Sequence, residues 1–156
     1  MGGIDRLQDS VQQGGSATGN PDADALLREN PNALLIAVLL DQQVKAELAF
    51  EGPYKLMSRL GHLNMKDLAE ADLGELKTIF GQKPAVHRFY NKMAGSVQEL
   101  AAYLTDHYEA DAANLWSDAD SWDENESRVS ELPGFGASKV ATLRSALPLF
   151  GYQVPA

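Results

Sequence analysis

Apolar residues recur along this chain at the three- and four-residue spacing of amphipathic helices, and no segment shows the two-residue alternation of a strand. The clearest helix is predicted over 88–108, where Val97, Leu100, Ala101 and Leu104 fall on one face. The pattern therefore predicts an all-α fold, a compact bundle of short helices.

Local signals indicate where these helices begin and end. Asn20-Pro21 and Asn30-Pro31 each place a capping side chain directly before a proline suited to the first helical turn. The second pair opens a very apolar helix, which we expect to run to about Gln43 and to be the central buried one. The other predicted helices are 54–60, begun by Pro53 and closed by Gly61, then 66–69, 73–80, 88–108, 112–116 and 124–131.

The most informative segment is 132–139, Leu-Pro-Gly-Phe-Gly-Ala-Ser-Lys. A polar helical run ends just before it, and a new helical pattern follows it and runs to Phe150, so the segment predicts a helix-hairpin-helix. Its glycines permit positive φ angles and close approach to the backbone. The free amides at the start of the second helix favour an anion such as a nucleic-acid phosphate. An ordinary turn with a glycine C-cap explains the same residues, and both interpretations stay open.

The 156 residues suit a single domain. We expect a flexible N-terminal segment over 1–20, which is polar and rich in Gly, Gln and Ser, followed by a helical domain over 21–156. No apolar run has the length of a membrane span, and the N-terminal residues lack the apolar centre of a signal peptide. The sequence therefore predicts a cytoplasmic protein with no membrane partner.

The net charge of −9 argues against generic binding to nucleic acid, but the charges are unevenly distributed. Residues 106–131 hold nine carboxylates and one arginine, whereas 132–156 hold no acid. The basic residues that stand out are Lys139 and Arg144 near the C-terminus, and Lys83, Arg88 and Lys92 with His87 among them. An acidic body with a locally basic edge predicts weak DNA binding through a small footprint.

The chain contains no cysteine, which excludes disulfides, thiolate metal sites and iron–sulfur clusters. Its three histidines, His62, His87 and His107, lie too far apart for a metal motif. We expect no metal site and no cofactor, leaving open only a monovalent cation at the hairpin.

Three blocks in order resemble the HhH-GPD family, the endonuclease III-like superfamily of base-excision DNA glycosylases. The first is 32–43, Asn-Ala-Leu-Leu-Ile-Ala-Val-Leu-Leu-Asp-Gln-Gln, and the second is 90–94, Tyr-Asn-Lys-Met-Ala. The third is the hairpin, with Phe150-Gly151 closing its second helix. Together they cover about 31–151. The strings Leu-Asp-Gln-Gln-Val and Leu-Pro-Gly-Phe-Gly are most similar to a short, poorly characterised bacterial branch of the family. For a member of that branch we expect a cytoplasmic protein that associates with the nucleoid when it binds DNA.

The resemblance implies an interface that grips the DNA backbone and fills the gap left by a flipped base. Gln43 aligns with the residue that enters the duplex in this family, with Gln42 or Val44 near it. The residues that the resemblance implies in DNA binding are Gln42, Gln43, Gly134, Phe135, Gly136, Ser138 and Lys139. Three further residues, His87, Arg88 and Tyr90, are expected to line the cleft.

The chain departs from the family at its catalytic positions. The family's essential aspartate falls, counted without gaps, on Ala156, and 152–156 hold no carboxylate. In the lyase members a nucleophilic lysine occupies the position that corresponds to Ser138 here. Lys139 follows it, and one residue along a helix rotates the side chain by about 100° away from that position. Lys139 is therefore predicted to contact phosphate rather than to act as a nucleophile.

Asp41 is the candidate substitute carboxylate, because it lies two residues from Gln43. The alternative is that Asp41 only bonds a local amide or Lys45 at the end of its helix.

Three functions remain open at this point. The first is a DNA glycosylase or abasic-site lyase with a rearranged site. The second is a non-catalytic sensor of damaged or abasic DNA, favoured by the missing aspartate. The third is a helical protein-interaction module with the acidic stretch 106–131 as its contact surface.

Overall fold

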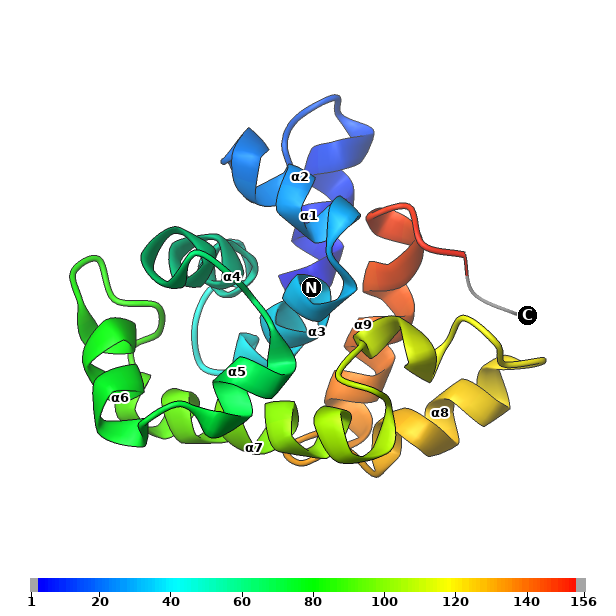
Figure 1. The fold of residues 1–156 in the computed structure, drawn as a ribbon. Helices are drawn as coiled ribbons and strands as arrows, with labels where there is room; N and C mark the ends of the chain where they lie inside the picture. Colours follow the sequence, from blue (N-terminus) through cyan, green and yellow to red (C-terminus); the bar gives the residue numbers. More distant parts are fainter. Residues whose placement is uncertain (1–2, 154–156) are drawn as a thin grey trace.

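The computed structural model describes residues 3–153, and this part of the chain forms nine α-helices and one 3-10 helix with no strand (Figure 1). The elements are α1 (Gly3–Gln12), α2 (Pro21–Glu29), α3 (Pro31–Leu40), α4 (Ala46–Leu60), α5 (Met65–Glu70), α6 (Leu73–Gly81), α7 (Tyr90–His107), η1 (Ala112–Leu115), α8 (Trp122–Ser130) and α9 (Ala137–Leu149). The predicted all-α fold is confirmed. None of the helices between residues 3 and 153 combines the length and hydrophobicity needed to cross a lipid bilayer.

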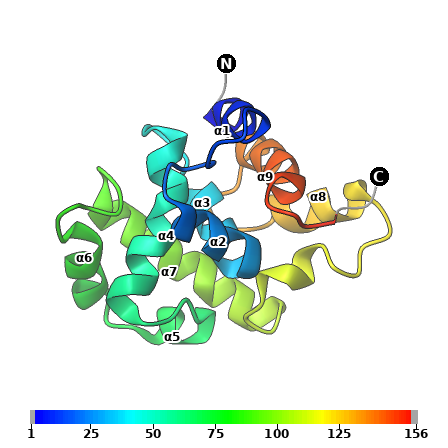
Figure 2. The same ribbon diagram turned by 90° about the horizontal axis from the view of Figure 1, so that it is seen from above.

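Helix α3 lies at the centre of the molecule. Helices α4, α5 and α6 lie on one side of it, and α8 and α9 lie on the other (Figure 1 and Figure 2). Every residue from Ala33 to Leu40 is buried, as expected for a helix that is apolar all round. Its start is the predicted one, since the Asn30 side chain accepts hydrogen bonds from the amides of Asn32 and Ala33. It ends at Leu40, before the expected Gln43, because the backbone leaves the helical region at Asp41 (φ −77°, ψ 70°).

Pro53 does not begin a helix, and that prediction was wrong. It lies inside α4, although a proline there removes one backbone hydrogen bond. Gly52 and Pro53 are both buried, and a Cβ atom on Gly52 would lie 2.6 Å from Leu40 Cδ1. This close packing against α3 outweighs the local preference of proline. Gly61 ends the helix at φ 80°, as predicted.

The segment 1–20, expected to be flexible, instead contains α1, which packs on α4 and α9 and buries Leu7 fully. The connection to α2 is held by the buried carboxylate of Asp24. That carboxylate accepts hydrogen bonds from the Ser16 hydroxyl, from the Ala17 amide at 2.9 Å and from the amide and hydroxyl of Thr18 at 3.0 and 2.7 Å. Burial raises the pKa of Asp24, but these hydrogen bonds outweigh it, and the pKa lies below its usual value.

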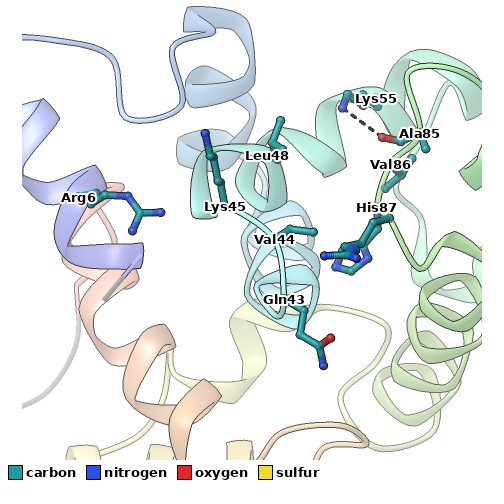
Figure 3. A pocket seen from close by; sticks show the side chains of 10 residues that line it. Arg6, Gln43, Val44, Lys45, Leu48, Lys55, Ala85, Val86 and His87 are labelled. Atoms are coloured by element: carbon teal, nitrogen blue, oxygen red, sulfur yellow. Dashed lines mark hydrogen bonds between the residues drawn. The ribbon is translucent and has the colours of Figure 1, made fainter. Parts of the chain in front are cut away.

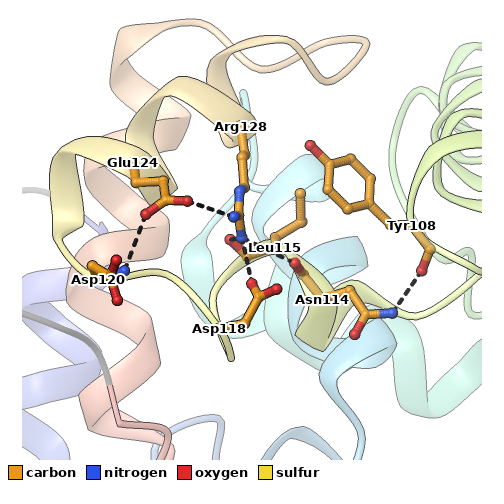
Figure 4. A network of polar contacts seen from close by, with 7 residues as sticks. All are labelled: Tyr108, Asn114, Leu115, Asp118, Asp120, Glu124 and Arg128. Carbon is orange, nitrogen blue, oxygen red and sulfur yellow. Dashed lines mark hydrogen bonds and ion pairs between the residues drawn. The ribbon is translucent and has the colours of Figure 1, made fainter.

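Arg128 fixes the helix that leads into the hairpin. Its guanidinium forms ion pairs of 2.7 Å with Asp118 and with Glu124 (Figure 4). It also donates hydrogen bonds of 3.3 Å to the carbonyl oxygens of Asn114 and Leu115. Because one side chain bonds both α8 and the end of η1, α8 is oriented relative to the body of the protein. Two of the nine carboxylates in the acidic stretch are thereby paired.

Candidate nucleic-acid interface

The turn between α8 and α9 is a tight hairpin anchored by buried side chains. Leu132 and Phe135 are buried, and the Phe135 amide donates a hydrogen bond of 3.1 Å to the Leu132 carbonyl. Gly134 has φ 82°, a conformation that side chains disfavour, and a Cβ atom there would lie 3.0 Å from Leu39 Cδ1. The fold of the turn therefore requires glycine at position 134.

Gly136 differs, because nothing inside the protein requires it. Its φ of −90° suits any residue, and a Cβ atom there would meet nothing within 4 Å. It begins α9 without a side-chain cap, and the first α9 hydrogen bond runs from the Val140 amide to the Gly136 carbonyl. Ala137 and Ser138 are exposed, so the amides of this first turn face outward. The arrangement suits an external anion that approaches the backbone closely.

Lys139 points inward rather than toward the open side of the turn. Its ammonium donates a hydrogen bond of 2.5 Å to the carbonyl oxygen of Leu39, at the C-terminus of α3. Burial lowers the pKa of Lys139, with the charge of Asp41 acting against this shift. The ammonium is thus bound to α3 in this structure, and its contact with phosphate stays a prediction, while the neighbouring Ser138 is exposed.

The two predicted glutamines differ in position. The Gln42 amide contacts the Leu39 carbonyl at 3.3 Å and Met93 Sδ at 3.5 Å, so its side chain lies against the protein. Gln43 is exposed and adopts a left-handed backbone conformation with φ 56°. Its side chain extends away from that of Lys45 (Figure 3). Of the two side chains, that of Gln43 is the more exposed.

His87, expected to line the cleft, holds the loop that carries these glutamines. Its ring is only 3 % exposed. Nδ1 accepts a hydrogen bond of 2.9 Å from the Phe89 amide, so Nε2 carries the proton and donates to the Gln42 carbonyl at 3.0 Å. Burial lowers the pKa of His87, and hydrogen bonding to Gln42 opposes this shift. Both ring nitrogens are occupied, which makes His87 a positioning residue.

The start of α7 presents aromatic rings between cations. Phe89 and Tyr90 are 38 % and 39 % exposed, and Arg88 and Lys92 beside them are also exposed. The Arg88 guanidinium lies 4.9 Å above the Phe89 ring. Arg88 and Tyr90 were expected at the cleft from the sequence, whereas Phe89 was not. The signal that identifies it is an aromatic residue between basic ones, a combination used to stack on nucleic-acid bases.

Asp41 is partly buried where α1, α3 and α9 meet. A Cβ atom on Gly3 would lie 3.6 Å from its Oδ1. Burial raises the pKa of Asp41, while the charges of Lys139 and Arg6 act in the opposite direction. Both pKa shifts have the same main cause, the partial burial of the two side chains, and the opposite charge of the other residue acts against each shift. Ala156, the position of the family's aspartate, lies outside the described residues, and between residues 3 and 153 no group of three or more acidic or histidine side chains is arranged to hold a metal ion.

The chain matches a known protein family over most of its length. The model of the HhH-GPD superfamily base excision DNA repair protein matches residues 36–151. The match contains the hairpin, the Asp41–Lys45 loop and the start of α7, and it leaves α1 and α2 outside. A comparison with curated protein sequences gives no match.

Proposed function

Because the chain belongs to the HhH-GPD superfamily of base excision DNA repair proteins, we propose that it recognises damaged or abasic sites in duplex DNA. The hairpin holds a backbone phosphate, and Gln43 fills the gap in the base stack. The observation that carries this proposal is Gly136. Neither its backbone angles nor its surroundings require glycine, and without a side chain there the start of α9 stays open to a ligand that approaches the backbone closely.

The position of Gln43 supports the role in the base stack. Extruding a base costs about a few kcal/mol, least where the base is damaged or missing, so a residue that fills the gap gives preference for lesions. Gln43 is exposed in a left-handed conformation, which costs about 1–3 kcal/mol in a residue other than glycine. The His87 hydrogen bond to the neighbouring Gln42 carbonyl holds that loop in place.

The charge distribution supports weak binding with a small salt dependence. The chain carries a net charge of −9, but Arg88 and Lys92 are exposed beside Phe89 and Tyr90. Few phosphates are therefore neutralised, and the affinity depends only modestly on salt. Stacking on the exposed rings adds about 1–3 kcal/mol per base without reading the sequence.

Base removal is a second candidate function, favoured by the surroundings of Asp41. A carboxylate there would stabilise the oxocarbenium-like transition state of glycosidic bond cleavage. Lys139, whose pKa burial lowers, is its cationic neighbour. The family's aspartate position holds no carboxylate, so any such cleavage depends on Asp41 and we expect it to be slow.

One panel of duplexes tests both functions. It contains intact DNA and DNA with deaminated, oxidised, alkylated or abasic positions, and each duplex is assayed for binding and for cleavage with and without alkaline treatment. We expect tighter binding to at least one lesion than to intact DNA. Cleavage only after alkali reports base removal, and cleavage without it reports lyase activity. Equal affinity for every duplex would contradict lesion recognition, and absence of any DNA binding would favour a protein-interaction module.

A further inference from the structure

A pocket of about 610 Å³ lies between α1, α4 and the loop 82–89, beside Gln43 (Figure 3). Gln43, His87 and Arg88 have roles in the interface described above, but the other residues that line the pocket have none. Four cationic side chains line it: Arg6, Lys45, Lys55 and Arg88. No carboxylate is among its lining residues, although acids outnumber basic residues in the chain by 22 to 13. The pocket is therefore a local concentration of positive charge suited to an anion.

Two of these cations are available to a ligand. Arg6 is paired with Glu47 at 3.4 Å, and Lys55 is paired with Glu51 at 3.7 Å. Lys45 and Arg88 are exposed, and neither forms an ion pair with any residue between 3 and 153. An anion entering the pocket meets these two charges without having to break an existing pair.

The rest of the lining is apolar. Leu48 is 50 % exposed, and Val44 and the largely buried Val86 also line the pocket. The volume lies within the roughly 300–1,000 Å³ range of small-molecule sites. An apolar surface surrounded by cations matches a planar ring system joined to an anionic group.

We propose that this pocket binds a nucleotide, with Lys45 and Arg88 contacting its phosphate and Leu48, Val44 and Val86 contacting its base. Arg6, which is paired with Glu47, adds a third cation from α1, and α1 lies outside the matched residues 36–151. The ligand is either a free nucleoside 5′-phosphate or the 5′-phosphorylated end of a DNA strand. The site is separate from the hairpin and does not require it.

The proposal is tested by calorimetry, in which the 156-residue protein is titrated separately with deoxyadenosine 5′-monophosphate, deoxyadenosine and inorganic phosphate. The nucleotide should bind more tightly than either fragment. Lys45→Glu should weaken nucleotide binding about tenfold, as expected for the loss of one charged contact. Leu48→Ser should weaken nucleotide binding and leave phosphate binding unchanged. Lys66→Glu, the same charge change at an exposed position on α5, should have no effect.

The proposal is overturned if the nucleotide binds no more tightly than phosphate, or if a folded Lys45→Glu protein keeps its nucleotide affinity. Single-stranded oligonucleotides with and without a 5′-phosphate identify the source. Tighter binding of the phosphorylated strand than of the mononucleotide assigns the site to strand ends, and equal affinity assigns it to free nucleotides. A Gly136→Ala variant separates this site from the hairpin, since it should bind duplex DNA more weakly and keep nucleotide binding.

Discussion

The ammonium of Lys139 at the start of α9 donates a hydrogen bond of 2.5 Å to the carbonyl oxygen of Leu39 at the end of α3, across 100 residues of chain. Helix C-termini carry unpaired carbonyl groups and partial negative charge, so a cation there is stabilising. This bond joins the hairpin to the central helix, and through Gln42, which contacts the same carbonyl, to the glutamine loop.

Lys139→Gln should reduce stability by about 1 kcal/mol, because it removes the hydrogen bond to Leu39 but also removes the partly buried charge whose burial lowers the pKa of Lys139. Urea denaturation measures the change, with Lys66→Gln as the exposed control. DNA affinity should fall by the same factor for every sequence, since the hairpin that grips phosphate is displaced. An unchanged unfolding free energy would show that the bond to Leu39 contributes nothing.

The two hairpin glycines should respond in opposite ways to alanine. Gly134→Ala should cost at least about 1–2 kcal/mol, because φ is 82° there. Gly136→Ala should cost less than about 1 kcal/mol, because only an N-cap preference is lost, yet it should weaken binding to duplex DNA. Thermal unfolding and fluorescence anisotropy on the same preparations separate the two effects. Normal DNA affinity in Gly136→Ala would remove the hairpin backbone from the interface.

Gln43→Ala should lose preference for abasic over intact duplex while keeping most of its affinity for intact DNA. The side chain is exposed, so its removal leaves the core untouched. The quantity to measure is the ratio of the dissociation constants for abasic and intact duplex. Gln42→Ala serves as the control, because the Gln42 side chain lies against Met93. If the ratio is the same in wild type and Gln43→Ala, this residue does not enter the duplex.

Stability should fall as the pH drops below about 6.5, the ordinary pKa of histidine. Burial holds the pKa of His87 below that value in the folded protein, so the unfolded chain takes up a proton first and is favoured. Protonation of Nδ1 also removes the hydrogen bond from Phe89. Urea denaturation between pH 5 and 8 should show this slope in wild type and a smaller one in His87→Gln. The exposed His107→Gln variant should keep it.

Asp41→Asn should stabilise the protein at pH 7. Burial raises the pKa of Asp41, so ionisation favours the unfolded chain at pH values above the ordinary pKa, and the gain should disappear as the pH falls toward 4. If Asp41 acts in base removal, the same change abolishes turnover and leaves affinity for abasic DNA nearly intact, because transition-state stabilisation adds little to ground-state binding. Equal turnover in both proteins would exclude Asp41 from the chemistry.

Local chemistry in the sequence was enough to predict much of the fold. The caps at Asn20 and Asn30 and the end at Gly61 depend on hydrogen bonds and backbone angles within a few residues, and the structure has all three. The prediction that a helix begins at Pro53 was wrong because it depends on contacts outside the local sequence. The place of Pro53 inside α4 is set by the packing of Gly52 on Leu40, which no local pattern reports.

The candidate site was predictable to a smaller extent. The hairpin and both glutamines are visible as motifs, but the direction of each side chain depends on contacts far along the chain. The bond from Lys139 to Leu39 and the bond from His87 to Gln42 join segments that the sequence does not show to be neighbours. The order of residues 3–20 similarly depends on Asp24, whose hydrogen bonds reach back to Ser16 and Thr18.

Gly136 also gives a way to interpret divergence among related proteins. Since the fold tolerates a side chain there, a descendant that has stopped binding DNA is free to accept other residues at this position by neutral drift. Gly134 would persist in the same descendant, because the hairpin still has to turn at φ 82°. A lineage that keeps glycine at 134 and varies at 136 would thus be expected to have retained the architecture after selection on ligand binding ended.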